Sequence, residues 1–156
     1  MKKRPEEKLF RRFSKKAATL SLAESCTGGL ASSRVTDVPG SSPYFSGAVV
    51  AYSNDIKVNI LKVKRSTIKK HGAVSPETAG EMARGVRRLS GTDIGASITG
   101  IAGPSGSRPL KPVGLAYAAF SDNKRTVIRK IFLKGGRLKL KDAFARALLE
   151  FILECM

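Results

Sequence analysis

The sequence has few of the side chains that build metal centres, disulfide frameworks and base-stacking surfaces. It contains no tryptophan, one histidine and two cysteines, and its aromatic content is 6%. The cysteines, Cys26 and Cys155, lie near opposite ends of the chain, without metal-ligand or disulfide-framework spacing. We therefore expect no metal site and no disulfide, and a reducing cytoplasm is the expected location.

Long apolar runs are also missing. No window approaches the roughly 18 consecutive apolar residues of a membrane span, and the basic residues at positions 2–4 are not followed by the apolar stretch of a signal peptide. We expect a soluble protein without a membrane partner. The 156 residues, 42% of them hydrophobic, are enough for one domain covering 1–156.

Acidic side chains are scarce: 12 Asp and Glu stand against 29 Lys and Arg, so the formal net charge is +17. Such a field attracts phosphates, nucleotides or RNA without selecting among them. The basic residues are scattered rather than interleaved with aromatics, which argues against a base-stacking surface. We expect nucleic acid to bind only through non-specific charge.

Hydrophobic periodicity predicts strands that alternate with helices. Helices are predicted at 5–15, 30–35, 54–61, 66–70, 75–90 and along an apolar stripe that ends the chain, Phe144, Ala147, Leu148, Phe151 and Ile152. Strands are predicted at 18–22, 49–52, 94–98, 113–120 and 126–133, the last two joined as a hairpin. The pattern indicates an α/β fold, a single three-layer α/β/α domain with a mixed central sheet, in which residues 1–16 form a basic N-terminal helix.

The segment AESCTGGL, residues 23–30, follows the first predicted strand and leads into a helix. Ser25 lies at this turn, and the N–H groups of Thr27, Gly28 and Gly29 could point into one small volume. That arrangement suits a bound phosphate or the oxyanion of acyl transfer. Alternatively, Ser25 or Thr27 simply caps the helix. The glycine pair favours the binding turn, because a cap does not need two glycines.

A nucleophilic Ser25 needs a base. The single histidine, His71, precedes a turn and a helix cap, so a structural role is favoured over a Ser-His-Asp triad. Lys57 lies in the first turn of the helix that begins after Ser53, where the helix dipole and surrounding positive charge favour the neutral amine that a lysine base requires. Cys26 is the competing nucleophile, paired with His71, or else a small buried apolar residue.

A second glycine-rich segment, TGIAGPSG at residues 99–106, follows the strand predicted at 94–98. Its glycines could bring backbone amides against a ligand, or the segment is only a long turn.

Six segments, in this order and spacing, together resemble the C-terminal domain of the CinA family: AESCTGG, TDVPGSSPYF, VAYSNDIK, HGAVSPET, TGIAGPSG and KPVG. The resemblance implies an amidohydrolase that converts nicotinamide mononucleotide and water into nicotinic acid mononucleotide and ammonia. It implies Ser25 and Lys57 as the catalytic pair, assisted by Tyr52. Together with the two glycine turns, it gives the expected substrate-binding residues Thr27, Gly28, Gly29, Thr99, Gly100, Gly103 and Arg137.

The resemblance further implies a homodimer that acts on a small pyridine nucleotide without a metal or organic cofactor. Two departures from the family pattern leave the substrate preference open. Lys141 stands where a second arginine is frequent, and Ser105-Gly106-Ser107 replaces Asp-Gly-Gly. A non-catalytic nucleotide- or RNA-binding module of the same fold is the alternative function.

Overall fold

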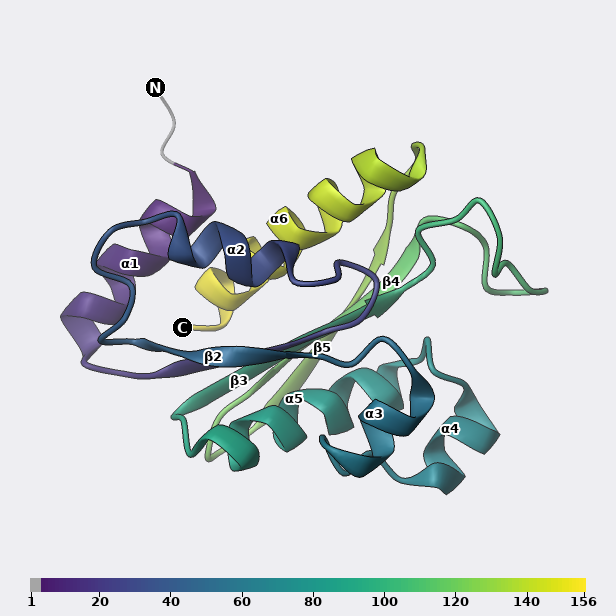
Figure 1. Cartoon of the computed structure of the whole chain (residues 1–156), viewed down its shortest axis with the longest axis horizontal. Coiled ribbons are helices and arrows are strands. Elements are labelled where there is room, and N and C mark those ends of the chain that lie inside the picture. The colour runs from purple at the N-terminus through teal and green to yellow at the C-terminus, as the bar shows by residue number, and fades with distance from the viewer. Residues whose placement is uncertain (1–3) are drawn as a thin grey trace.

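The computed structural model describes residues 4–156 and contains one five-stranded sheet with the strand order β2-β1-β3-β4-β5 (Figure 1). The strands are β1 (Leu20–Glu24), β2 (Phe45–Val50), β3 (Ile94–Gly100), β4 (Leu115–Ser121) and β5 (Thr126–Phe132). β1 pairs in parallel with β2 and β3, whereas β3–β4 and β4–β5 are antiparallel. The predicted mixed sheet is confirmed.

Helices cover both faces of this sheet (Figure 1). They are α1 (Pro5–Lys16), α2 (Leu30–Thr36), α3 (Asn54–Asn59), α4 (Arg65–His71), α5 (Pro76–Ser90) and α6 (Arg137–Cys155). A large core joins α1, α2 and α6 to one face through side chains such as Phe13, Leu22 and Phe144, and a smaller one buries Met82 and Val86 of α5 against the other. The three-layer α/β/α fold is therefore confirmed.

The longest helix on the second face, α5, has clear start and stop signals. Ser75 Oγ accepts a hydrogen bond from the Thr78 N–H at 3.2 Å, Pro76 occupies the first turn, and Gly91 ends the helix with a φ of 63°. A Cβ at Gly85 would lie only 2.0 Å from the Leu61 carbonyl oxygen. The glycine thus lets α5 pack closely against the segment that follows α3.

Several predicted strand and helix properties differ from the structure, in burial or in boundaries. β1 is buried along its whole length, although its sequence alternates between apolar and polar residues, because helices cover both faces of the central strands. β2 begins at Phe45 rather than 49, and its alternating half-buried and exposed residues fit an edge strand. α3 ends at Asn59, short of the predicted 61. Positions 1–3 of the predicted basic helix lie outside the described residues.

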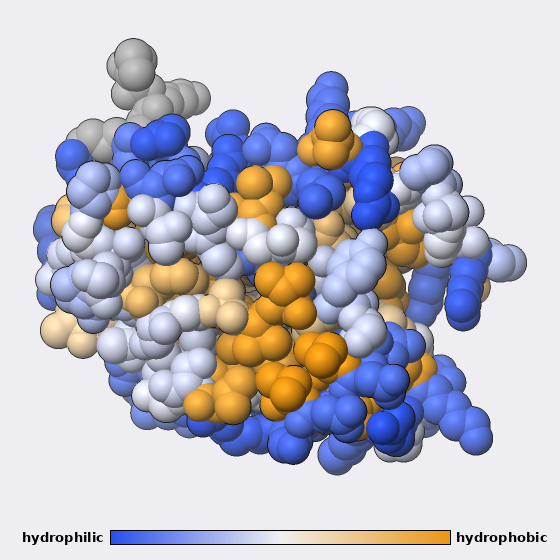
Figure 2. Space-filling view, viewed as in Figure 1, coloured by the Kyte–Doolittle hydropathy of each residue, from blue (hydrophilic) through white to orange (hydrophobic). Residues whose placement is uncertain are grey.

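The face shown in Figure 2 is largely hydrophilic, with an apolar patch over β2 and α3. Val50, Ile56 and Ile60 in this region are 46%, 38% and 41% exposed. Within residues 4–156, no helix combines the length and apolarity that crossing a membrane requires. The expected homodimer stays a prediction.

TDVPGSSPYF lies at one end of the sheet, where Phe45 pairs with Leu20, whereas the other segments singled out by sequence motifs meet at the opposite end (Figure 1). The carboxyl ends of the parallel strands β1 and β3 lie there, beside α3, α4 and the start of α6. In α/β sheets, ligands bind outside the carboxyl ends of the strands, where neighbouring connections diverge. This end is therefore where a site is expected.

Candidate active site

Ser25 and Lys57 are brought together at the carboxyl end of β1. Lys57 Nζ lies 3.1 Å from Ser25 Oγ. Ser25 directly follows β1, and its N–H donates to the Ile98 carbonyl of β3 at 3.0 Å, which fixes the backbone of the nucleophile. Lys57 comes from α3, whose start is capped by Ser53 Oγ accepting from the Ile56 N–H at 3.2 Å. Two rigid segments thus hold the pair.

The surroundings of Lys57 favour its neutral form. Its side chain is only 1% exposed, and burial lowers the pKa of its ammonium from 10.5 to about 8. Besides Ser25, Nζ contacts the carbonyl oxygens of Ala51 at 2.7 Å and Tyr52 at 3.4 Å. A neutral amine has two N–H donors and one lone pair, which match two carbonyls and one hydroxyl.

The sequence analysis therefore predicted a low Lys57 pKa for the wrong physical reason. The helix dipole and the surrounding positive charge were expected to act, but the principal cause is desolvation of the buried ammonium. α3 has only six residues, and Lys57 lies in its last turn rather than its first. Burial of a long basic side chain is a tertiary property that local sequence does not reveal.

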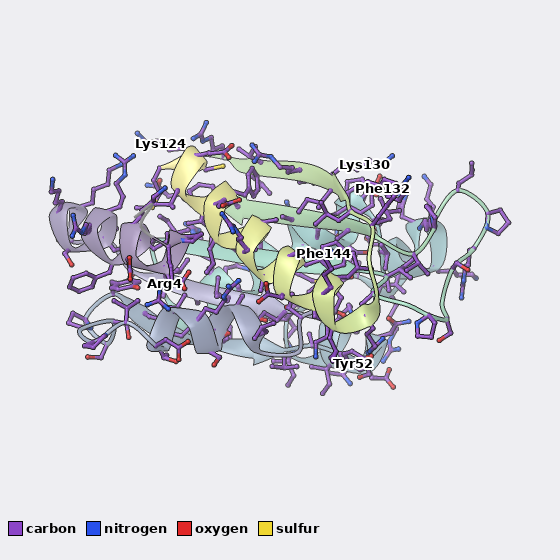
Figure 3. The ribbon with its side chains drawn as sticks, turned by 90° about the horizontal axis from the view of Figure 1, so that it is seen from above. Arg4, Tyr52, Lys124, Lys130, Phe132 and Phe144 are labelled. Carbon is purple, nitrogen blue, oxygen red and sulfur yellow. The ribbon has the colours of Figure 1, made fainter. Side chains whose placement is uncertain are left out.

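Tyr52 and Arg137 form a second pair, which lines the same hollow as Ser25. Arg137, the first residue of α6, donates from Nη2 to the Tyr52 hydroxyl at 3.0 Å and from Nη1 to the Gly103 carbonyl at 2.6 Å. Tyr52 is 62% exposed, and Figure 3 shows it at the edge of the molecule near the start of α6. Arg137 thus links three segments that are distant in sequence.

Glu24, which the sequence analysis missed, holds the turn that follows Ser25. It is completely buried, and its carboxylate accepts hydrogen bonds from the hydroxyls of Thr27 and Ser32 and from the N–H groups of Gly29, Ala31 and Ser32. These donors include the otherwise unpaired amides at the start of α2. An acid at the end of an apolar strand, just before a glycine turn, was the available signal.

The glycine turn itself differs from the expectation. Thr27, Gly28 and Gly29 do not line the hollow beside Ser25. The Gly29 N–H donates to Glu24, and the Gly28 N–H donates to the Ser25 carbonyl at 3.1 Å. Their amides therefore do not converge on a ligand volume. Neither Ser25 nor Thr27 caps α2, because the cap position is Gly29 and the capping acceptor is the Glu24 carboxylate.

The glycines instead give the turn its backbone conformation. Gly28 and Gly29 have φ values of 61° and 97°, which most other residues adopt only at a cost. In the part of the chain that the structure describes, the Cys26 and Thr27 N–H groups donate to no backbone carbonyl. Of these two residues, only Cys26 lines the hollow. The donor available beside the nucleophile is thus the amide that directly follows it.

Cys26 and His71 do not form the competing nucleophile–base pair. Burial raises the pKa of the Cys26 thiol to about 12, which keeps it protonated at neutral pH. His71 lies at the end of α4, with Nδ1 3.4 Å from Glu77 Oε1, and it does not line the hollow that Cys26 lines. Cys26 is instead a small buried residue, as the alternative interpretation predicted.

The second glycine-rich segment closes one side of the site. Thr99, Gly100 and Gly103 all line the hollow of about 310 Å³ that Ser25, Lys57, Tyr52 and Arg137 also line. Thr99 Oγ1 donates to the Ala73 carbonyl at 2.9 Å. A Cβ at Gly100 would lie 2.6 Å from the Ala116 Cβ, so β3–β4 packing also requires this glycine. Asn54, which the sequence analysis did not select, lines the same hollow.

Three or more metal-ligating side chains do not cluster anywhere in residues 4–156. The polar groups gathered at the hollow include the Ser25 hydroxyl, the buried Lys57 amine, the Tyr52 phenol and the Arg137 guanidinium. This set can attack a carbonyl, move a proton and bind an anion. It provides the components of acyl transfer through a serine ester.

Comparisons with known proteins show which family the chain resembles. A model of the CinA C-terminal domain family matches residues 2–156. A protein of Caldanaerobacter subterraneus subsp. tengcongensis is 52% identical over 136 residues, 87% of this chain and 33% of that protein. The CinA-like protein of Kosmotoga olearia is 48% identical over 147 residues, 94% of this chain and 36% of its own. The chain thus spans about a third of the length of these curated relatives.

Solved structures share the fold. The crystal structure of the competence/damage inducible protein CihA from Agrobacterium tumefaciens has a TM-score of 0.93 and is 34% identical, covering 96% of this chain and 92% of that one. The competence damage-inducible protein A (ComA) from Klebsiella pneumoniae subsp. pneumoniae has a TM-score of 0.93 at 27% identity, covering 97% and 96%.

Proposed function

The chain belongs to the CinA C-terminal domain family, and from this premise we propose that it is an amidohydrolase acting on a pyridine nucleotide. The proposed reaction converts nicotinamide mononucleotide and water into nicotinic acid mononucleotide and ammonia. One observation carries the proposal: a buried lysine with a pKa near 8 lies 3.1 Å from the hydroxyl of a backbone-anchored serine.

Acylation begins when Ser25 Oγ attacks the carboxamide carbon and Lys57 Nζ takes the hydroxyl proton. A bond forms between Oγ and carbon, and the carbonyl oxygen becomes an oxyanion. Lys57 then gives the proton to the departing nitrogen, the carbon–nitrogen bond breaks, and ammonia leaves. The product of this half-reaction is a nicotinoyl ester of Ser25.

Deacylation repeats the sequence with water as the nucleophile. Lys57 takes a proton from water, which attacks the ester carbon, and returns that proton to Ser25 Oγ as the ester bond breaks. The carboxylic acid is released and both side chains regain their starting protonation states. We assign the Cys26 N–H to the developing oxyanion, because it is the free amide next to the nucleophile.

Tyr52 and Arg137 are proposed to assist. The Tyr52 hydroxyl accepts from Arg137, which leaves its own proton free to donate toward the reacting centre. A guanidinium has five N–H donors, and two of those of Arg137 reach Gly103 and Tyr52. The others are available to an anionic part of the substrate, in keeping with the phosphate-binding role that the family resemblance implies.

The experiment is to incubate the purified chain with nicotinamide mononucleotide and to follow ammonia and nicotinic acid mononucleotide together. Equal amounts of both products, in proportion to enzyme, support the proposal. The +17 charge motivates the alternative of a nucleotide- or RNA-binding module. No ammonia, combined with RNA binding whose logarithmic salt slope is about −0.7 per neutralised phosphate, favours that alternative.

A further inference from the structure

The hollow at Ser25 continues into a second one. That second hollow, about 440 Å³ in volume, lies between the end of α4 and the loop that precedes β4. The two share the lining residues Asn54, Ala73, Val74, Ile101 and Gly106. They therefore form one cleft, with the nucleophile toward one end. Figure 1 shows α4 and this projecting loop at the same end of the sheet.

The far end of the cleft is strongly basic. Lys69, Lys70, Arg108 and Lys111 line it, and no carboxylate does. None of these four side chains lies in an ion pair with an acid within residues 4–156. Glu77 lies 3.4 Å from His71 Nδ1, at the end of α4, but does not line the hollow.

A structural role explains only part of this cluster. Lys69 and Lys70 lie in the last turn of α4, where cations oppose the helix dipole. Lys111 Nζ donates to the His71 carbonyl at 2.5 Å, so it satisfies an end carbonyl of the same helix. Arg108 has neither role. It comes from the loop, is exposed, and brings a guanidinium to the same hollow.

We propose that this far end, formed by Lys69, Lys70, Arg108 and Lys111, binds a phosphoryl group of the ligand whose carboxamide reaches Ser25. The inference rests on the proposed function and adds a second phosphate site, apart from Arg137, which lines the hollow at Ser25 but not this far end. Concentrated cations in a concave site favour phosphate oxygens, and arginine can bind them through two hydrogen bonds. The group is either the 5′-phosphate of a mononucleotide or the distal phosphate of a dinucleotide.

The test variant is Lys69→Gln/Arg108→Gln, which removes two charges and leaves the Lys111–His71 contact intact. Lys8→Gln/Arg12→Gln on α1 is the matched control, because it removes two exposed charges away from the cleft. Inorganic pyrophosphate, titrated calorimetrically, probes the subsite without any amidase chemistry. We expect its affinity to fall at least about tenfold in the test variant and to be unchanged in the control.

Kinetics on the riboside, the mononucleotide and the dinucleotide of nicotinamide identify the source of the phosphoryl group. A higher KM for the mononucleotide, with the riboside unchanged, assigns the subsite to the 5′-phosphate. A higher KM for the dinucleotide alone assigns it to the distal phosphate. The subsite is overturned if the test variant and the control have the same pyrophosphate affinity and the same three KM values, even if ammonia release continues. If the wild-type chain shows no amidase activity, the proposed function is wrong. If the test variant nevertheless loses pyrophosphate binding, the subsite is still supported.

Discussion

Lys57 Nζ lies 3.1 Å from Ser25 Oγ although thirty-two positions separate the two residues. β1 and α3 hold them, and the only other partners of Nζ among the described residues are two backbone carbonyls. The buried amine therefore has no acid to keep it charged, and the serine hydroxyl is the group that its lone pair can accept from.

The pH dependence of catalysis should follow Lys57. The neutral amine is the active base, and burial lowers its pKa to about 8. We expect kcat/KM for nicotinamide mononucleotide to rise with pH and to level off above about 8. Initial rates between pH 6 and 10 check this profile. A rate that is already constant at pH 6.5 would remove a titrating lysine from the mechanism.

Lys57 should also cost stability at neutral pH. Because its pKa is about 8 in the folded chain and 10.5 ordinarily, the unfolded chain binds more protons between these values. Stability due to this group thus rises with pH across that window. Relative to Lys57→Met, the wild type should gain about 2 kcal/mol of unfolding free energy between pH 7.5 and 10.

Urea titrations of both proteins at the two pH values measure this difference. The comparison cancels the other titrating side chains, which are the same in both proteins. A difference between the two proteins that does not vary with pH would mean that the buried amine titrates normally. Lys57→Met should fold and should release no ammonia.

Glu24 should be a strong determinant of both stability and rate. Glu24→Gln keeps the shape but turns an acceptor oxygen into an NH2 group that faces backbone and hydroxyl donors. We expect a loss of about 2–3 kcal/mol of unfolding free energy and a lower kcat, since Ser25 is the next residue. Glu150→Gln, in an exposed pair with Arg146, is the control and should change stability by less than about 1 kcal/mol. Equal effects of the two changes in denaturant titration would contradict the assignment.

Arg137→Ala should impair more than phosphate recognition. Because the guanidinium also contacts the Tyr52 hydroxyl and the Gly103 carbonyl, we expect kcat to fall roughly tenfold on the nicotinamide riboside as well as on the mononucleotide. Lys139→Ala, in the same turn of α6, is the control. Steady-state kinetics on both compounds decide. Unchanged riboside kinetics would limit Arg137 to the phosphate.

The α/β/α fold and its mixed sheet could be predicted because apolar periodicity and the caps at Ser75 and Gly91 are local signals. The extent of β2 could not, since Phe45 and Gly47 gain their strand conformation from pairing with β1. Tertiary pairing overrides local preference at such an edge.

The site likewise has features that the sequence predicts and features that it does not. The family motifs are sufficient to point to Ser25 and Lys57. The burial that lowers the Lys57 pKa and the Glu24 network both depend on long-range packing. The Thr27-Gly28-Gly29 turn was assigned to a ligand because its sequence does not reveal that Glu24 already accepts its amide and hydroxyl donors.

The central claim is that Ser25 is the nucleophile of an amidase, and its neighbour provides the sharpest control. Ammonia release from nicotinamide mononucleotide should be measured for the wild type, Ser25→Ala and Cys26→Ala under the same conditions. We predict that Ser25→Ala abolishes release, whereas Cys26→Ala keeps most of it, because the buried thiol stays protonated. Full activity of Ser25→Ala, or loss of activity confined to Cys26→Ala, would contradict the account.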